Sequence, residues 1–222
     1  MTVLRKILRL FGWKGVDASA VFCVSAAALL AKLAKADGRV TANEIEGIEF
    51  AFKRLGFSPA TREQAIAKFR EAKDDEVSID HYAHKFVKAV RSISICELFY
   101  EILWDIAAAD GNVSKNELII LQRIPRMLKI RIEWYGYFYK QHFGKAQLGK
   151  SFASSVDVSY AILGADKNDD FDTLQCKYRE LAKQNHPDCL RAQGLPEELI
   201  GKATERMSRI NNAWRCIRSQ FE

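Results

Sequence analysis

Proline and glycine are scarce in this chain, with 4 prolines and 12 glycines among 222 residues. An all-β protein needs the frequent turns that these residues form, so their scarcity favours long, uninterrupted helices. The composition, 48% hydrophobic and 28% charged, is that of a soluble globular protein with one core or two small cores. Disordered, collagen-like and disulfide-scaffold classes are therefore excluded, and we expect an all-α fold.

Paired cysteines are also absent. The five cysteines lie far apart and include no Cys-x-x-Cys pair of the kind that binds zinc or exchanges thiols: Cys23, Cys96, Cys176, Cys189 and Cys216. This usage fits a reducing compartment, and we expect a cytoplasmic protein.

A dense basic stripe is missing too, although the formal net charge is +6. Four of these positive charges lie in residues 1–15, which hold no acid, and residues 157–222 have a net charge of −1. Proteins that bind nucleic acid neutralise many phosphates with clustered Lys and Arg, and the body of the chain has no such cluster. We therefore expect no nucleic-acid partner.

Residues 1–15 have the pattern of a short basic amphipathic helix. Its apolar face consists of Val3, Leu4, Ile7, Leu8 and Phe11. Such a helix can lie on an anionic membrane surface, here the inner face, or dock on the protein's own body, and the pattern leaves both open. Residues 18–31 are uncharged but shorter than the roughly 20 residues that cross a bilayer, so we expect a buried helix there.

Two segments, residues 34–45 and 107–118, repeat the pattern Ala-Asp-Gly-x-Val-Ser/Thr-x-Asn-Glu at an offset of 73 residues. In each copy the glycine, Gly38 or Gly111, can close a helix in the left-handed conformation. The following Thr or Ser forms a capping box with the Glu three residues later, which starts the next helix. The sequence therefore predicts a helix-turn-helix joint that is used twice.

The same joints carry four carboxylates that are candidate ligands for calcium or magnesium: Asp37, Glu44, Asp110 and Glu117. Neither joint satisfies the calcium-hand pattern at its sixth and twelfth positions, and helix capping alone explains these residue types. Capping is the favoured interpretation, and a divalent metal is the alternative. His81 and His84 lie one turn apart without an evident third ligand, so we expect a solvent-facing pair rather than a zinc site.

Helical patterns over residues 44–55, 59–72, 79–92 and 95–109 place these joints in an amino-terminal bundle, which we assign to residues 16–143. The twice-used joint in an all-helical stretch resembles the TerB, or tellurite-resistance-like, family over residues 18–142. The resemblance implies a bundle of seven or eight helices, sometimes credited with metal binding. An aromatic cluster is expected in the core, with one exposed edge: Trp134, Tyr135, Tyr137, Phe138, Tyr139 and Phe143.

Residues 144–156 are small and polar, as in a flexible linker, and residues 157–222 follow as a second helical unit. In this unit Gly164 ends a first helix, Asp170 or Asp172 caps a second, and Pro187 ends it. Pro196 starts the last helix, whose apolar stripe consists of Leu199, Ala203, Met207, Ile210, Ala213, Trp214 and Ile217. Two helices with facing stripes predict an antiparallel hairpin.

Four pieces of this unit match, in order and spacing, the J domain of the DnaJ co-chaperones: residues 160–164, residues 177–182, the tripeptide His186-Pro187-Asp188 and residues 210–214. The resemblance implies docking on a DnaK-type heat-shock ATPase and stimulation of its ATP hydrolysis. The tripeptide then makes the short-range contacts, and a cationic face steers toward an acidic partner surface: Lys177, Arg179 and Lys183. A J domain makes or breaks no bond, so we expect no enzyme activity, no catalytic residue and no required cofactor.

A TerB-like bundle followed by a J domain resembles the DjlA-type co-chaperones, and so does the run at residues 190–200. Such proteins begin with a transmembrane segment, whereas this sequence begins with the short basic helix, so membrane anchorage does not carry over. The residue after the tripeptide is usually Lys or Arg, and here it is Cys189. The partner-facing loop therefore has one positive charge fewer. We expect a co-chaperone whose amino-terminal bundle localises, senses or binds a partner.

Three alternatives stay open at this point. The tripeptide can be a plain interhelical turn, because Asp is common after Pro in turns and a histidine suits a helix end. The chain can also be a metal-responsive stress-response adaptor with a vestigial J domain. The third alternative is a membrane-peripheral adaptor that binds through residues 1–15.

Overall fold

The structure is a computed structural model, and it describes residues 18–35, 42–108, 113–143, 155–193 and 195–222. An amino-terminal bundle consists of α2 (Ala18–Lys35), α3 (Ala42–Arg54), α4 (Pro59–Asp74), α5 (Ile79–Val90), α6 (Ile93–Ala107), α7 (Lys115–Leu128) and α8 (Glu133–Phe143). A carboxy-terminal unit consists of α9 (Ser155–Leu163), α10 (Phe171–Asn185), α11 (Pro187–Ala192), the 3-10 turn η1 (Glu197–Leu199) and α12 (Ile200–Arg218). The described residues contain no β-strand, which confirms the all-α prediction.

Several predictions concern residues outside these ranges. The basic amphipathic segment, the carboxylates of Asp37 and Asp110, and residues 144–154 of the predicted linker all lie outside the described residues. The backbone of Glu44 belongs to α3, but its side chain lies outside them as well. The last part of the predicted linker is helical, because α9 begins at Ser155.

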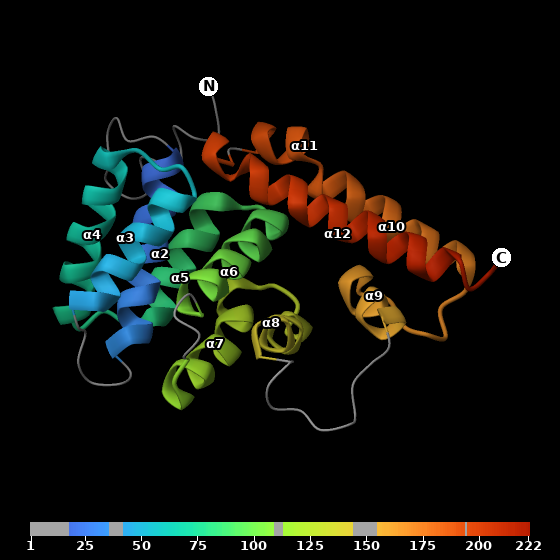
Figure 1. Cartoon of the computed structure of the whole chain (residues 1–222), viewed down its shortest axis with the longest axis horizontal. Helices are drawn as coiled ribbons and strands as arrows, with labels where there is room; N and C mark the ends of the chain where they lie inside the picture. The colour runs from blue at the N-terminus through green and yellow to red at the C-terminus, as the bar shows by residue number, and fades with distance from the viewer. Residues whose placement is uncertain (1–17, 36–41, 109–112, 144–154, 194) are drawn as a thin grey trace.

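Helix α2 is the apolar segment that the sequence marks as a buried helix, and it runs through the bundle (Figure 1). Every residue from Ala20 to Leu30 is buried, and α4, α5 and α7 pack around the helix. Phenylalanines of α2, α5 and α6 contact one another in the core. Phe22 contacts Phe99 edge-on at 5.0 Å between ring centroids, and Phe86 stacks on Phe99 at 4.0 Å. Among the described helices, none has the length and apolar character needed to cross a membrane.

Serine caps start four helices of the bundle, at Ser58, Ser78, Ser92 and Ser114. The capping box predicted for the second joint is present: Ser114 Oγ accepts from the Glu117 amide at 3.1 Å, and Glu117 Oε2 accepts from the Ser114 amide at 2.9 Å. These bonds satisfy amides that the first helical turn leaves unpaired. The carboxylate of Glu117 is therefore engaged in starting α7.

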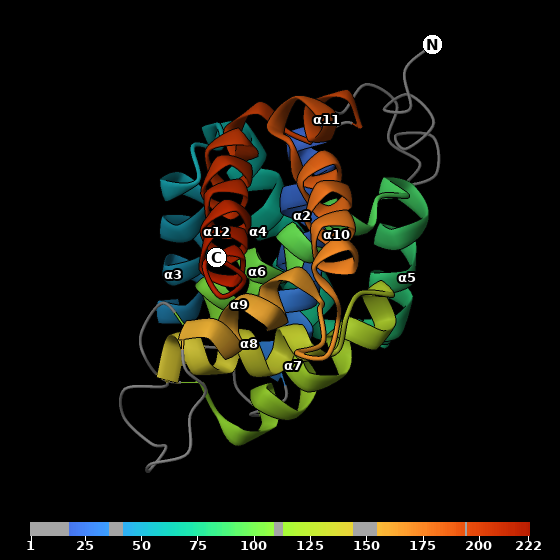
Figure 2. The ribbon, with the colours of Figure 1, turned by 90° about the vertical axis from the view of Figure 1, so that its right-hand side faces the viewer.

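The carboxy-terminal unit is built on α10 and α12, which lie side by side as an antiparallel hairpin (Figure 2). Tyr178 of α10 stacks on Trp214 of α12 at 5.0 Å, and its hydroxyl lies 3.1 Å from Oδ1 of Asn211. Helix α9 packs across α12 and ends at Gly164, which has the left-handed φ of +62°. Asp170, rather than Asp172, caps α10 by accepting from the Thr173 amide at 2.7 Å.

Pro187 ends α10 as predicted, but the segment between Pro187 and the last helix differs from the prediction. Pro187 follows the end of α10 but also begins α11, a six-residue helix that the sequence did not predict. Pro196 precedes the 3-10 turn, and α12 itself begins at Ile200. Proline suits the first turn of a helix because the amide that it lacks has no partner there. The turn at the tripeptide is therefore short and is followed at once by a helix.

Candidate partner-docking site

The tripeptide His186-Pro187-Asp188 joins α10 to α11 at the surface. His186 has φ −61° and ψ 131°, because the residue before a proline is pushed out of the helical conformation. Its Nδ1 accepts a hydrogen bond from the Asp188 amide at 3.3 Å. The side chains of His186 and Asp188 are 55% and 76% exposed, so both are accessible to a partner protein.

The Asp188 carboxylate is shared with a neighbouring arginine. Nη1 of Arg191 lies 2.8 Å from Asp188 Oδ1, and Nε of Arg191 lies 2.8 Å from Glu197 Oε1. These hydrogen bonds to Glu197 and Asp188 raise the pKa of Arg191, which keeps its charge at any physiological pH. Exposed ion pairs contribute little to stability, so a cation of a partner can replace Arg191 on Asp188 at low cost.

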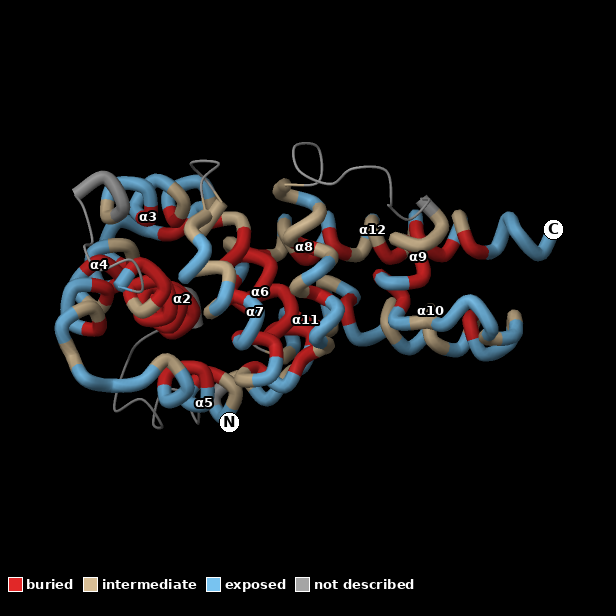
Figure 3. The backbone as a smooth tube through the Cα atoms, turned by 90° about the horizontal axis from the view of Figure 1, so that it is seen from below, coloured by how far each residue is buried: buried red, intermediate tan, exposed pale blue. Residues whose placement is uncertain are grey.

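Two of the three predicted cations share one face of α10. Arg179 and Lys183 are one turn apart and both are exposed, which makes them neighbours on the helix surface. Lys177 instead binds the loop before the helix, with Nζ 2.5 Å from Oδ2 of Asp169. This bond holds the pKa of Asp169 below its usual range. Figure 3 shows exposed residues along the length of α10, between residues of intermediate exposure, and the buried residues of the helix are Leu174 and Asn185.

Helix α12 contacts both parts of the molecule. Ala203 at its start, and Leu199 just before it in η1, belong to the core of the amino-terminal bundle. Ile210, Trp214 and Ile217 belong to the core of the carboxy-terminal unit. The predicted apolar stripe is therefore present but is divided between two cores. The start of α12 packs on α6 of the bundle, whereas α10 packs on α9, α11 and α12, and the hairpin extends away from the bundle (Figure 1).

A buried cluster of charges joins α6 of the bundle to α12. The side chains of Glu97 and Glu101 are 5% and 2% exposed. Arg206 Nη2 donates to Glu97 Oε2, and Arg209 Nη2 donates to Glu101 Oε1. Burial lowers the pKa of Arg206, and the two carboxylates oppose that shift. The Arg206 guanidinium also lies 4.7 Å from the ring centroid of Trp134.

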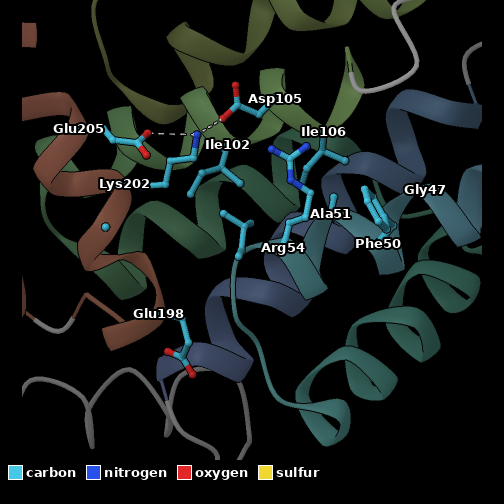
Figure 4. A pocket seen from close by; sticks show the side chains of 12 residues that line it. Gly47, Phe50, Ala51, Arg54, Ile102, Asp105, Ile106, Glu198, Lys202 and Glu205 are labelled. Atoms are coloured by element: carbon cyan, nitrogen blue, oxygen red, sulfur yellow. Dashed lines mark hydrogen bonds and ion pairs between the residues drawn. The ribbon is translucent and has the colours of Figure 1, made fainter.

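A second ion pair between the same helices lies beside a groove (Figure 4). Lys202 Nζ is 2.7 Å from Asp105 Oδ2 and 3.6 Å from Glu205 Oε2. Burial disfavours the charged ammonium, but the hydrogen bond to Asp105 and the negative charges of Asp105, Glu205 and Glu101 together outweigh burial and raise the pKa of Lys202. The groove has a volume of about 590 Å³ and lies between α3, α6 and α12, with the side chain of Phe50 at one side.

Arg131, in the turn before α8, connects the bundle to α9. It donates to the carbonyls of Ala161 and Ile162 at 3.3 and 3.1 Å in the last turn of α9, where the Ala161 carbonyl also accepts from the Gly164 amide at 3.2 Å. Its Nε also lies 3.4 Å from Glu97 Oε1. The left-handed φ of Gly164 favours glycine, and a Cβ atom there would also force the Arg131 guanidinium to move away from its carbonyl partners.

The other candidate residues are placed as follows. The described residues contain no cluster of three or more His, Cys, Asp or Glu side chains that could hold a metal ion, and Glu117 is the only proposed metal ligand whose side chain is described. His81 and His84 are both exposed. Trp134 and Phe138 of the aromatic cluster are buried, and its other four members are partly buried.

The residues that join the two parts were missed in the sequence analysis, although a signal was present. Glu97 and Glu101 are one turn apart in α6, which is otherwise mostly apolar, and Arg206 lies between Ala203 and Ile210 on the apolar face of α12. Charges on apolar faces need buried partners of opposite sign. The opposite charges on the apolar faces of α6 and α12 could therefore have predicted that these two helices pack against each other. The same charge pattern could not have identified Asn185, because its burial depends on how the hairpin packs on the bundle.

Comparison with known proteins agrees with this arrangement. The family model of the tellurite resistance protein TerB matches residues 24–135, and that of the DnaJ domain matches residues 158–220. A co-chaperone protein DjlA from Vibrio vulnificus strain YJ016 is 30% identical over 90% of this chain and 78% of that relative. The DjlA proteins of Coxiella burnetii and Escherichia coli K12 are 29% and 27% identical, over 84% and 92% of this chain and 72% and 81% of the relatives.

No solved structure matches the chain. The two family models nevertheless divide it between the amino-terminal bundle and the carboxy-terminal unit, in the same order as the sequence motifs. The carboxy-terminal unit is therefore a J domain, with the tripeptide in the turn after its helix α10. With both domains present and the relatives aligned over most of their length, this chain belongs to the DjlA family of DnaJ-type co-chaperones.

Proposed function

We propose that this chain docks on a DnaK-type heat-shock chaperone in the cytoplasm and stimulates its ATPase. The observation that carries the proposal is the exposure of His186 and Asp188 at the end of α10, beside the exposed cations Arg179 and Lys183. Other surfaces of the hairpin are covered, because α9 packs across α12 and the start of α12 packs on α6 of the bundle. Helix α10 is thus the face of the J domain that a large partner can reach.

Each group of the proposed site has a chemical role. Arg179 and Lys183 attract an acidic surface of the partner during encounter, while Lys177 fixes the loop before α10 through Asp169. Asp188 exchanges Arg191 for a cation of the partner, and the exposed ring of His186 supplies a polar, orientable contact. Binding stimulates hydrolysis by favouring the hydrolysing conformation of the partner, because a ligand shifts a population through its differential affinity.

Reversing the charges of α10 is expected to weaken docking. The variant Arg179→Glu with Lys183→Glu places two acids against the acidic partner surface, so its dissociation constant should rise roughly tenfold at low salt. The difference should shrink as salt is added, because both side chains are exposed and screened. Surface plasmon resonance with the ATP-bound partner at two ionic strengths measures both effects.

The matched control reverses two exposed cations of α7, Lys115→Glu with Arg126→Glu, which changes the net charge of the chain by the same amount. It should bind within about twofold of the wild type, because long-range attraction is weak at distances beyond a Debye length. Equal weakening in both variants would mean that net charge, and not α10, directs docking.

A further inference from the structure

The residue before the tripeptide is fully buried and is bound by a side chain from α12. Asn185, at 0% exposure, donates from Nδ2 to the carbonyl of Leu181 at 2.9 Å within α10. Its Oδ1 accepts a hydrogen bond from Nε of Arg206 at 2.9 Å. Arg206 in turn donates from Nη2 to Glu97 of the amino-terminal bundle. A continuous series of buried hydrogen bonds therefore runs from α6 to the residue next to His186.

Glu97 is itself fixed by the bundle. Its Oε1 accepts from the indole nitrogen of Trp134 at 2.7 Å, and Nε of Arg131 lies 3.4 Å from the same oxygen. Because the carboxylate has several partners and almost no exposure, its position is set by α6 and α8 together. The guanidinium of Arg206 is thereby fixed through Nη2 by Glu97 of the bundle, and its Nε donates to Asn185.

The segment after the tripeptide is bound to the bundle as well. Leu190, at 0% exposure, and Leu195, at 4%, belong to the apolar core of the bundle. Gln193, just after α11, accepts from the hydroxyl of Ser92 at the start of α6 at 2.5 Å. The tripeptide thus lies between two points at which the J domain is attached to α6.

From these contacts we infer that Glu97, Arg206 and Asn185 are positioning residues for the tripeptide, so that the amino-terminal bundle is part of the support of the partner-docking turn. The inference rests on the proposed function and adds a role for the bundle in it. If a partner binds only one orientation of His186 and Asp188, its apparent affinity is reduced in proportion to the fraction of molecules that have this orientation. The bundle raises this fraction by fixing the carboxamide of Asn185, which precedes the turn.

The inference separates two arginines of α12 that both reach α6. Arg206 donates to Glu97 and also to Asn185, whereas Arg209 donates to Glu101 of the bundle and, among the described residues, makes no hydrogen bond with Asn185. Lysine keeps the charge at either position but lacks the planar fork that donates in two directions. Arg206→Lys should therefore keep the ion pair with the bundle and lose the bond to Asn185, and Arg209→Lys is the matched control.

The test uses the full chain and two readouts. The first is stimulation of a DnaK-type ATPase in single turnover, measured against co-chaperone concentration. Arg206→Lys should raise the concentration for half-maximal stimulation roughly threefold to tenfold, the usual range of coupling between linked sites, while stimulation at saturation stays near that of the wild type. Arg209→Lys should stay within about twofold. Glu97→Gln, which weakens the hold on Arg206, should change in the direction of Arg206→Lys.

The second readout needs no partner. Amide hydrogen exchange should become faster over residues 181–190 in Arg206→Lys and in Asn185→Ala, with unchanged protection in α2 and α6 as evidence that both variants are folded. Equal effects of Arg206→Lys and Arg209→Lys, or no effect of either, in both readouts would overturn the inference. If the wild type stimulates no DnaK-type ATPase, the proposed function fails, and hydrogen exchange alone then decides whether the bundle positions the turn.

Discussion

Replacing His186 with glutamine is expected to abolish stimulation of the DnaK-type ATPase. The imidazole lies at the centre of the exposed turn, with a side chain that is 55% accessible and bonded only within the turn. Contacts of this kind at the centre of an interface carry about 2 kcal/mol or more, so stimulation at a fixed, subsaturating concentration should fall at least roughly thirtyfold. Single-turnover hydrolysis of ATP by the partner measures this loss.

The same substitution should leave the fold intact, because an exposed side chain contributes little to the free energy of unfolding. His84→Gln, which makes the same change at an exposed position of α5, is the matched control and should stimulate as the wild type does. Full stimulation by His186→Gln would show that the tripeptide is a plain turn between helices. Loss of stimulation together with unfolding would instead reveal a structural role that the geometry does not predict.

Replacing Arg206 with methionine is expected to destabilise the protein strongly. Its side chain is 3% exposed and faces two carboxylates that are 5% and 2% exposed, so its removal leaves buried negative charges without their main partner. Breaking a buried ion pair from one side costs about 3–5 kcal/mol, and Arg209 and Arg131 offset part of it here. We expect a loss of about 3 kcal/mol in the free energy of unfolding, measured by urea denaturation.

The control for this prediction is another ion pair of α12. Arg218 lies 2.9 Å from Glu222 with both side chains exposed, so Arg218→Met should cost less than about 0.5 kcal/mol. Adding Glu97→Gln to Arg206→Met should recover part of the loss, because the second change removes one of the unpaired charges. Similar stabilities of the wild type and Arg206→Met would contradict the view that these charges join the two parts of the molecule.

Much of the architecture follows from local sequence patterns. The apolar run of α2, the capping box at Ser114 and the end of α9 at Gly164 were all predicted, because each depends on residues that are close together in the chain. The position of the tripeptide after α10 was also predicted, since the conformation of His186 is imposed by the next residue. These elements place the docking turn without any tertiary information.

The contacts between the two parts could not be predicted in the same way. The sequence suggested a flexible linker followed by a separate J domain, whereas Leu190, Leu195 and Leu199 pack into the core of the bundle. Such contacts depend on which faces of distant helices meet, and helical periodicity alone gives no register between them. The run at residues 190–200, which the sequence analysis noted only as a resemblance, is now explained as the segment that docks on the bundle.

The joint at the start of α7 shows a limit of a different kind. The residue types that cap a helix are also those that bind calcium or magnesium, so the sequence could not separate the two interpretations. The hydrogen bonds between Ser114 and Glu117 give that carboxylate a capping role. The capping role of Glu117 became visible only in the geometry of its side chain, because composition and spacing are the same for a cap and for a metal ligand.

The most direct test of the account is the single-turnover rate of ATP hydrolysis by a DnaK-type chaperone as the full chain is added. The account predicts a rate that rises with concentration and saturates, because the exposed tripeptide and the cations of α10 engage the partner at one site. A rate that stays at the level of the partner alone, at concentrations where a J domain of known activity stimulates it, would contradict the account.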